Sequence, residues 1–293
     1  MAERRHRRRV SEAARGGRRQ PLQTGLSILP SLFTVGNIFC AYYSVMSTLN
    51  GKYDLAAIAI GVGYVLDGLD GRVARLTGTS TEFGAQLDSL ADVLTFGIAP
   101  AILAFSWGID WMGPAGSIGQ LNQTEQHIRS AGWVACFAFV ICGALRLARF
   151  NVQAQKPVDA SSKRYFVGLP IPAGAGLLAA FVHFLKVPIT DPGWSLLWSM
   201  LIAITAFLMI STVRYHNFKE LGIFSRRPRV TLVIAAMMIG LIFKFSEVTL
   251  LLLAVVYVSS GPVGRIHQLV RRLPIQVTPA AERTALETPR REP

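Results

Sequence analysis

Long apolar blocks separated by short polar segments dominate the chain. A bilayer core about 30 Å thick takes about 20 residues of helix to cross. Windows of that length give up to eight spans, at 30–49, 55–76, 84–107, 131–150, 166–187, 193–213, 229–245 and 247–263. The last two are shorter and are joined by Ser246 and Glu247 alone, which predicts a tight helical hairpin. We therefore expect an all-α integral membrane protein, a polytopic helical bundle with about eight transmembrane helices.

Composition agrees with this pattern. Of the 293 residues, 51% are hydrophobic and only 16% are charged, whereas a soluble domain carries about 25% charged residues. We expect three regions: a basic disordered cytoplasmic tail over 1–27, a transmembrane domain over 28–263, and a basic C-terminal tail over 264–293. The start of that last tail has the basic amphipathic pattern of a segment that lies on an anionic membrane surface.

A net charge of +13 is typical of proteins that bind nucleic acid, but the positions of the charges exclude that function here. Eight arginines fall within the first nineteen residues, and most other basic residues stand at alternate ends of the apolar blocks. With the N-terminus in the cytoplasm, the positive-inside rule is met by every Lys and Arg except Lys52, Arg129, Lys186 and Lys244. We therefore expect a protein integral to the plasma or inner membrane, with both termini cytoplasmic and no nucleic-acid partner.

Four aspartates stand inside the second and third spans, where each costs about 2.5–3.5 kcal/mol if nothing compensates its charge. The spacing is i, i+3 for Asp67 and Asp70, and i, i+4 for Asp88 and Asp92, so each pair shares one helix face. The two helices run antiparallel across a short loop, which puts all four carboxylates at similar depths of about 6–14 Å from the cytoplasmic helix ends. We expect them to converge near the cytoplasmic side.

Cations are the simplest compensation for such a cluster. Hard divalent ions prefer oxygen ligands, and Mg2+ (or Mn2+) is typically held by a few carboxylates plus substrate phosphates. Four acids can hold two ions about 3.5–4 Å apart, an arrangement suited to phosphoryl transfer. A salt-bridged packing cluster, a proton relay and an ion-coupled transporter are the alternatives. The small residues Gly68, Gly71, Ala74 and Gly84 permit close backbone approach and leave space for a ligand, while Arg75 can grip a diphosphate oxygen.

The same residues carry a family resemblance. Every fixed position of D-x-x-D-G-x-x-A-R-(x)8-G-x-x-x-D-x-x-x-D is met over residues 67–92, and this pattern resembles the signature of the CDP-alcohol phosphatidyltransferases. The resemblance implies a six-helix catalytic core, here followed by a C-terminal hairpin, a homodimer among membrane lipids, and two divalent ions under the CDP-diacylglycerol diphosphate. Carried over by position, Asp67, Asp70 and Asp88 are metal ligands, and Asp92 is a ligand that also acts as general base.

The resemblance also implies a CDP-lipid site at Gly71, Arg75 and Thr81, to which Gly84 adds space. Family members often open their first span with Pro-Asn/Asp-x-x-Thr near the nucleotide, and here Pro30, Ser31 and Thr34 stand at those positions, with Ser in place of the amide or acid. A serine can still donate or accept one hydrogen bond. The alternative for Ser31 is the N-cap of the first helix.

Residues outside the signature indicate the acceptor alcohol. The stretches 144–151 and 166–172, together with Arg214 and Tyr215, resemble the family members that use L-serine. Serine brings a carboxylate, which Arg146 or Arg149 can hold bidentately from one helix face. The alternative for these arginines is that they only set the orientation of the helix in the membrane, as cytoplasmic positive charges. The alternative acceptors are glycerol 3-phosphate and inositol phosphate. A covalent-histidine mechanism built on His-x-Lys motifs is excluded, because no histidine here has a lysine two residues later.

Overall fold

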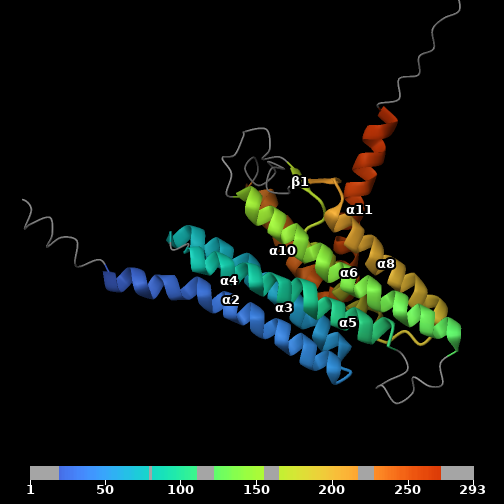
Figure 1. The fold of residues 1–293 in the computed structure, drawn as a ribbon. Helices are drawn as coiled ribbons and strands as arrows, with labels where there is room; N and C mark the ends of the chain where they lie inside the picture. The colour runs from blue at the N-terminus through green and yellow to red at the C-terminus, as the bar shows by residue number, and fades with distance from the viewer. Residues whose placement is uncertain (1–19, 79–80, 111–121, 155–164, 217–227, 272–293) are drawn as a thin grey trace, which may run out of the picture.

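The chain folds into one bundle of helices that pack side by side (Figure 1). The computed structural model describes residues 20–78, 81–110, 122–154, 165–216 and 228–271. It has eight helical segments over these ranges, one of which is α4 continuing through the π-helical turn η1 into α5. The bounds are α2 (Gln20–Leu49), α3 (Tyr53–Thr77), α4 (Glu82–Asp92), η1 (Val93–Ile98), α5 (Ala99–Gly108), α6 (Gln123–Ala154), α7 (Ile171–Leu185), α8 (Pro192–Ile210), α10 (Pro228–Lys244) and α11 (Ser246–Arg271).

The bundle is that of a polytopic helical membrane protein. In the part of the chain that the structure describes, five helical segments are long and apolar enough to cross a bilayer, and α7 and α10 are shorter apolar helices. Large apolar side chains stay exposed on the outside of the bundle, such as Leu232, Phe243 and Phe207, as expected where lipid replaces water around a protein. Each predicted span corresponds to one helical segment, and the predicted hairpin is confirmed, because only Phe245 separates α10 from α11.

Several predicted boundaries are wrong. Helix α6 begins at Gln123, eight residues before the predicted span, and α11 continues to Arg271, past the predicted start of the C-terminal tail at 264. Helix α2 begins at Gln20, so residues 20–27 are helical where the sequence suggested a disordered tail; Pro21 falls in the first turn, where its missing N–H leaves no bond unmade. Helix α7 begins only at Ile171, because the preceding residues form strand β1 (Tyr165–Val167). The remaining parts of the two predicted tails, 1–19 and 272–293, lie outside the described residues.

Strand β1 pairs antiparallel with β2 (Arg214–His216), an element that the sequence did not predict. Gly168 turns the chain from β1 toward α7 with a φ of +84°, a conformation that glycine adopts without the steric cost met by other residues. A Cβ at Gly168 would lie 2.4 Å from the backbone oxygen of Met209, and the N–H of Gly168 donates to the oxygen of Val213 at 2.8 Å. This turn fixes the end of α8 beside the start of α7.

We expect Gly168→Ala to destabilise the fold by about 2–4 kcal/mol, because the added Cβ combines positive-φ strain with a backbone collision that no rotamer relieves. Thermal unfolding of the purified protein in detergent measures the effect. Gly176→Ala is the matched control, since a Cβ there meets no atom within 4 Å and alanine favours the helix. Equal stability of the two variants would contradict the role given to this turn.

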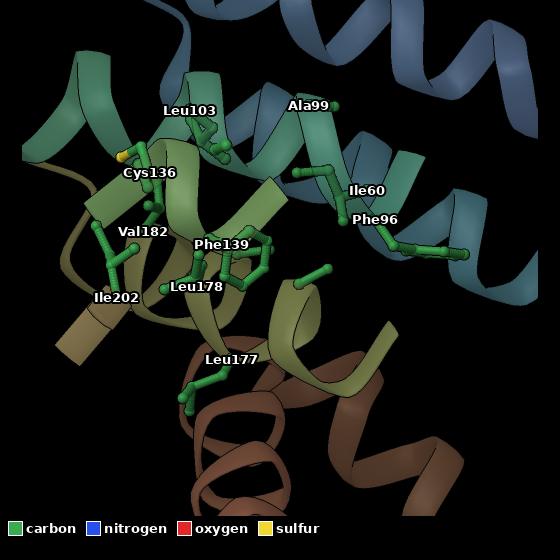
Figure 2. Packing of buried hydrophobic residues seen from close by; sticks show 14 of the residues in the cluster. Ile60, Phe96, Ala99, Leu103, Cys136, Phe139, Leu177, Leu178, Val182 and Ile202 are labelled. Carbon is green, nitrogen blue, oxygen red and sulfur yellow. The ribbon is translucent and has the colours of Figure 1, made fainter. Parts of the chain in front are cut away.

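The buried core lies where α3, η1, α5, α6, α7 and α8 meet (Figure 2). Phe96 and Phe139 are fully buried there, and the rings of Trp107 and Trp198 pack edge to face at 5.0 Å. The Trp198 indole N–H also donates to the oxygen of Ala104 at 2.9 Å, which satisfies a polar group in an apolar interior. This core holds the helix that carries Asp88 and Asp92 against the rest of the bundle.

A polar network joins three helices at the end of the bundle away from the aspartates. His183 on α7 lies between two partners, with Nδ1 2.5 Å from Asp54 Oδ1 on α3 and Nε2 3.0 Å from Ser246 Oγ on α11. An exposed ion pair joins Lys186 to Glu247 beside it, and this contact raises the pKa of Lys186 above its ordinary value. The C-terminal hairpin is thus attached to α3 and α7 by specific hydrogen bonds as well as by apolar packing.

Candidate functional site

The four sequence-predicted aspartates come together at one end of α3 and α4. One carboxylate oxygen from each of Asp67, Asp70 and Asp88 lies within 4.8 Å of the others. Asp92 is not part of that group of three, but its carboxyl group lies close to that of Asp67. The cluster forms as the sequence predicts. The two aspartates of each pair share one helix face, and the two pairs lie at similar depths.

The cluster fits a divalent cation in its chemistry. Asp70 is only 4% exposed, and the Oδ1 atoms of Asp88 and Asp92 are buried without a hydrogen-bond partner among the described residues. Such oxygens are costly unless something compensates them. Over the described ranges no ion pair joins these carboxylates to a lysine or arginine, which argues against the salt-bridged packing alternative. An all-oxygen donor set of this kind suits Mg2+ or Mn2+.

Helix α2 supplies one residue of the predicted nucleotide motif to this cluster. The buried Thr34 hydroxyl donates to Asp70 Oδ2 at 3.2 Å, which orients that carboxylate. Ser31 lies three residues earlier and is half-buried. The N-cap alternative for Ser31 is wrong, because Ser31 stands inside α2 and not at its first turn. The side chain of Pro30 lies outside the described residues.

The other predicted CDP-lipid residues line the end of the α3–α4 pair. Arg75 Nε donates to the oxygen of Gly71 at 2.7 Å, so the guanidinium folds back along its own helix. Thr81 caps α4 by accepting the N–H of Gly84 at 3.0 Å. A Cβ at Gly71, or at Gly68 one turn earlier, would meet nothing within 4 Å. The prediction that these two glycines allow close helix packing is therefore wrong. The prediction that they leave space for a ligand agrees with the structure.

Helix α6 lies against the same region. Asn151 Nδ2 donates to the hydroxyl of Ser89 at 2.9 Å, and Ser89 lies between Asp88 and Asp92 in sequence. The two candidate acceptor arginines precede Asn151 on α6 and differ from each other. Arg146 is half-buried, with an Nε atom that is buried and has no partner among the described residues, whereas Arg149 is exposed.

A π-helical turn follows directly after Asp92. The N–H of Ala99, at the end of η1, donates to the oxygen of Leu94 five residues earlier, and such turns occur often at functional sites. The buried Thr95 hydroxyl links this turn to α2 by donating to the oxygen of Asn37 at 3.1 Å. Sequence reasoning missed both Thr95 and the Ser89–Asn151 pair. The available signals were the position of Ser89 inside the aspartate motif and that of Asn151 at the end of the stretch 144–151.

Comparisons with known proteins converge on one chemistry. A family model described as CDP-alcohol phosphatidyltransferase matches residues 27–211. A Helicobacter pylori protein named CDP-diacylglycerol–serine O-phosphatidyltransferase is 35% identical over 201 residues, covering 67% of this chain and 74% of the relative. Proteins of the same name from Mycobacterium leprae and Bacillus subtilis are 34% and 29% identical, over 73% and 67% of this chain and 65% and 93% of the relatives.

Proposed function

The chain belongs to the CDP-alcohol phosphatidyltransferase family, and from that premise we propose that it transfers the phosphatidyl group of CDP-diacylglycerol to L-serine, giving phosphatidylserine and CMP. The observation that carries the proposal is the carboxylate cluster of Asp67, Asp70 and Asp88 on the family signature. The names of the relatives support serine as the acceptor. Because the family consists of transferases, the intramembrane aspartates no longer favour an ion-coupled transporter.

In the proposed reaction, Asp92 removes the proton of the acceptor hydroxyl, whose oxygen then attacks the β-phosphorus of CDP-diacylglycerol. The bond from that phosphorus to the CMP oxygen breaks, and CMP leaves in a single displacement. The closeness of the Asp92 and Asp67 carboxyl groups supports this role, because it places the base beside the cluster. Thr34 orients Asp70, and Arg75 stands at the helix end where it can bind a diphosphate oxygen.

Two divalent ions, Mg2+ or Mn2+, would be held by Asp67, Asp70, Asp88 and Asp92. When bound, they supply positive charge that offsets the carboxylates and the developing charge on the phosphoryl oxygens. Family membership supports this proposal, as does the all-oxygen donor set of the cluster. The open space beside Gly71 supports a CDP-lipid headgroup next to the ions.

The proposal extends to the architecture around the site. We assign the catalytic core to the six helical segments before residue 211, which the family match nearly spans, and treat α10 and α11 as an added hairpin within a transmembrane domain over 28–263. The alternation of basic residues supports cytoplasmic termini and a cytoplasmic site. A homodimer and basic terminal tails over 1–27 and 264–293 complete the proposal, with helix over residues 20–27.

A transferase assay tests the proposed acceptor. Purified protein in mixed micelles with CDP-diacylglycerol and Mg2+ is offered L-serine, glycerol 3-phosphate and inositol phosphate in turn, and CMP release is measured. We expect serine to be the fastest acceptor. A faster reaction with glycerol 3-phosphate or inositol phosphate would keep the family chemistry and overturn serine.

Arg146 is the residue that we propose to bind the serine carboxylate, because its Nε is buried and unpartnered among the described residues. A charge-assisted hydrogen bond contributes about 1.5–3 kcal/mol, so we expect Arg146→Ala to raise the KM for serine roughly tenfold to a hundredfold while sparing the KM for CDP-diacylglycerol. Steady-state CMP release measures both constants.

Arg149→Ala is the matched control, since Arg149 is exposed on the same helix and should leave the KM for serine within about twofold. Serinol keeps the hydroxyl and the amine of serine but lacks the carboxylate. It should be a poor acceptor for the wild type and should differ little between wild type and Arg146→Ala. If serinol matched serine, no arginine would be holding a carboxylate.

A further inference from the structure

Three helical segments meet at Gly63 on α3, next to the carboxylate cluster. Gly63 is buried, and a Cβ there would lie 2.7 Å from Thr95 Cγ2 in η1 and 2.9 Å from Asn37 Oδ1 on α2. Ordinary van der Waals contact of a Cβ begins at 3.4 Å. The backbone of α3 therefore approaches η1 and α2 at a distance that only a residue without a side chain allows.

This contact lies between the two helices that supply the carboxylates. Gly63 precedes Asp67 by four residues on α3, so the two residues share a helix face one turn apart. Thr95 follows Asp92 by three residues and is therefore within one turn of it. The separation of α3 from η1 at Gly63 and Thr95 thus sets how far apart the aspartates of α3 and α4 stand.

The Thr95 methyl group is the rigid side of this contact. Thr95 is fully buried, and its hydroxyl donates to the oxygen of Asn37 at 3.1 Å. Because turning χ1 would break that bond, Cγ2 stays against Gly63. The Asn37 amide has no hydrogen-bond partner among the described residues, and its last torsion is soft, so it can yield where Thr95 cannot. Tyr64 and Phe96, which pack edge to face at 6.2 Å, also hold α3 against η1.

We propose that the Thr95 methyl against Gly63 is a spacer that sets the width of the metal site and thereby its preference for Mg2+ over larger ions. Mg2+ takes oxygen ligands at about 2.0–2.1 Å in near-ideal octahedral geometry, whereas Ca2+ takes them at about 2.3–2.6 Å in flexible geometry. A small change in spacing therefore penalises Mg2+ more than Ca2+. The proposal rests on the metal site of the proposed function, but it concerns two positioning residues outside the signature.

Moving one methyl group across the contact tests the proposal. Gly63→Ala adds a second methyl, so we expect the Kd for Mg2+ to rise about tenfold to a hundredfold, as is typical when residues that support metal ligands change. The Kd for Ca2+ should rise less than about threefold. Thr95→Ser removes the spacer methyl but keeps the hydroxyl donor, and should weaken Mg2+ binding by about threefold to tenfold. The double variant again has one methyl and should bind Mg2+ within about threefold of wild type.

Titration calorimetry with Mg2+ or Ca2+ alone, on protein purified in detergent, measures these constants without turnover. Gly61→Ala is the matched control, because Gly61 lies two residues earlier on α3 and a Cβ there meets no atom within 4 Å. It should leave both constants within about twofold of wild type. A merely structural contact would lower thermal stability without changing the ratio of the two constants.

The proposal is overturned if Gly63→Ala keeps the wild-type ratio of Mg2+ to Ca2+ affinity, or if the double variant binds Mg2+ no better than Gly63→Ala. Should Gly63→Ala not fold, unchanged Mg2+ affinity in Thr95→Ser overturns the proposal by itself. If the wild type binds neither ion, the proposed metal site fails, and the spacer with it. If the wild type binds Mg2+ and every variant keeps its ratio, only the spacer fails.

Discussion

Replacing Asp88 with asparagine should abolish transfer, lowering kcat/KM by about a thousandfold or more. The substitution keeps the side-chain shape and removes one charge from a cluster whose oxygens lie within 4.8 Å of one another. Loss of one ligand from a two-ion site removes several kcal/mol of charge stabilisation, and about 4 kcal/mol corresponds to that thousandfold loss. CMP release in mixed micelles at saturating Mg2+ measures it. EDTA treatment of the wild type should have the same effect, reversed by added Mg2+ or Mn2+.

Asp191→Asn is the control for this variant. Asp191 caps α8 by accepting the N–H groups of Gly193 and Trp194, and asparagine caps helices about as well as aspartate. The control should keep near wild-type activity, which would show that loss of an aspartate charge is harmful only within the cluster. Near wild-type transfer by Asp88→Asn, or by EDTA-treated protein, would refute the metal proposal.

The second large effect is expected at Asp92, where asparagine should lower kcat by about 10²–10⁴ while CDP-diacylglycerol remains bound. General-base assistance is typically worth that factor, and Asp92 lies beside the group of three predicted ligands rather than within it. Single-turnover CMP release measures the chemical step, and binding of CDP-diacylglycerol to the variant is measured separately by titration calorimetry in micelles.

Ser89→Ala is a useful comparison, because it changes a residue of the same helix that bonds Asn151 and has no proposed role in proton transfer. It should lose much less in kcat than Asp92→Asn. Equal losses in the two variants would indicate that the helix position, and not the base, limits the reaction. A lipid-charged enzyme intermediate, trapped by incubation with CDP-diacylglycerol alone, would exclude the proposed single displacement.

The carboxylate cluster could be predicted because its geometry is local. Spacings of three and four residues define a helix face, and a short connection forces α3 and α4 to be antiparallel, so four positions in the sequence determine where the acids meet. The presence of the helices could be predicted equally well, because an apolar block long enough to cross a membrane rarely forms anything but a helix. The helix boundaries could be predicted less well. The apolar run at 166–170 is compatible with a helix, yet it forms the end of β1 and the Gly168 turn.

What could not be predicted depends on packing between distant segments. Strands β1 and β2 have three residues each, too few for an alternating pattern to be recognised. The hydrogen bond between His183 and Asp54 joins residues 129 positions apart, and nothing in either local sequence indicates it. The choice between Arg146 and Arg149 likewise needed the burial of each guanidinium, because both stand on one face of α6.

The π-helical turn over Val93–Ile98 holds one residue more than an α-helical turn would, because its hydrogen bond spans five residues and not four. The wider turn absorbs that extra residue locally, so the helix faces before and after it keep their relative direction. Deleting one residue there would let α4 run into α5 as a regular α-helix with Asp88 and Asp92 still facing Asp67 and Asp70. We expect the loss to fall on the contact with α2, because the buried Thr95 hydroxyl, which donates to the oxygen of Asn37, stands in this turn.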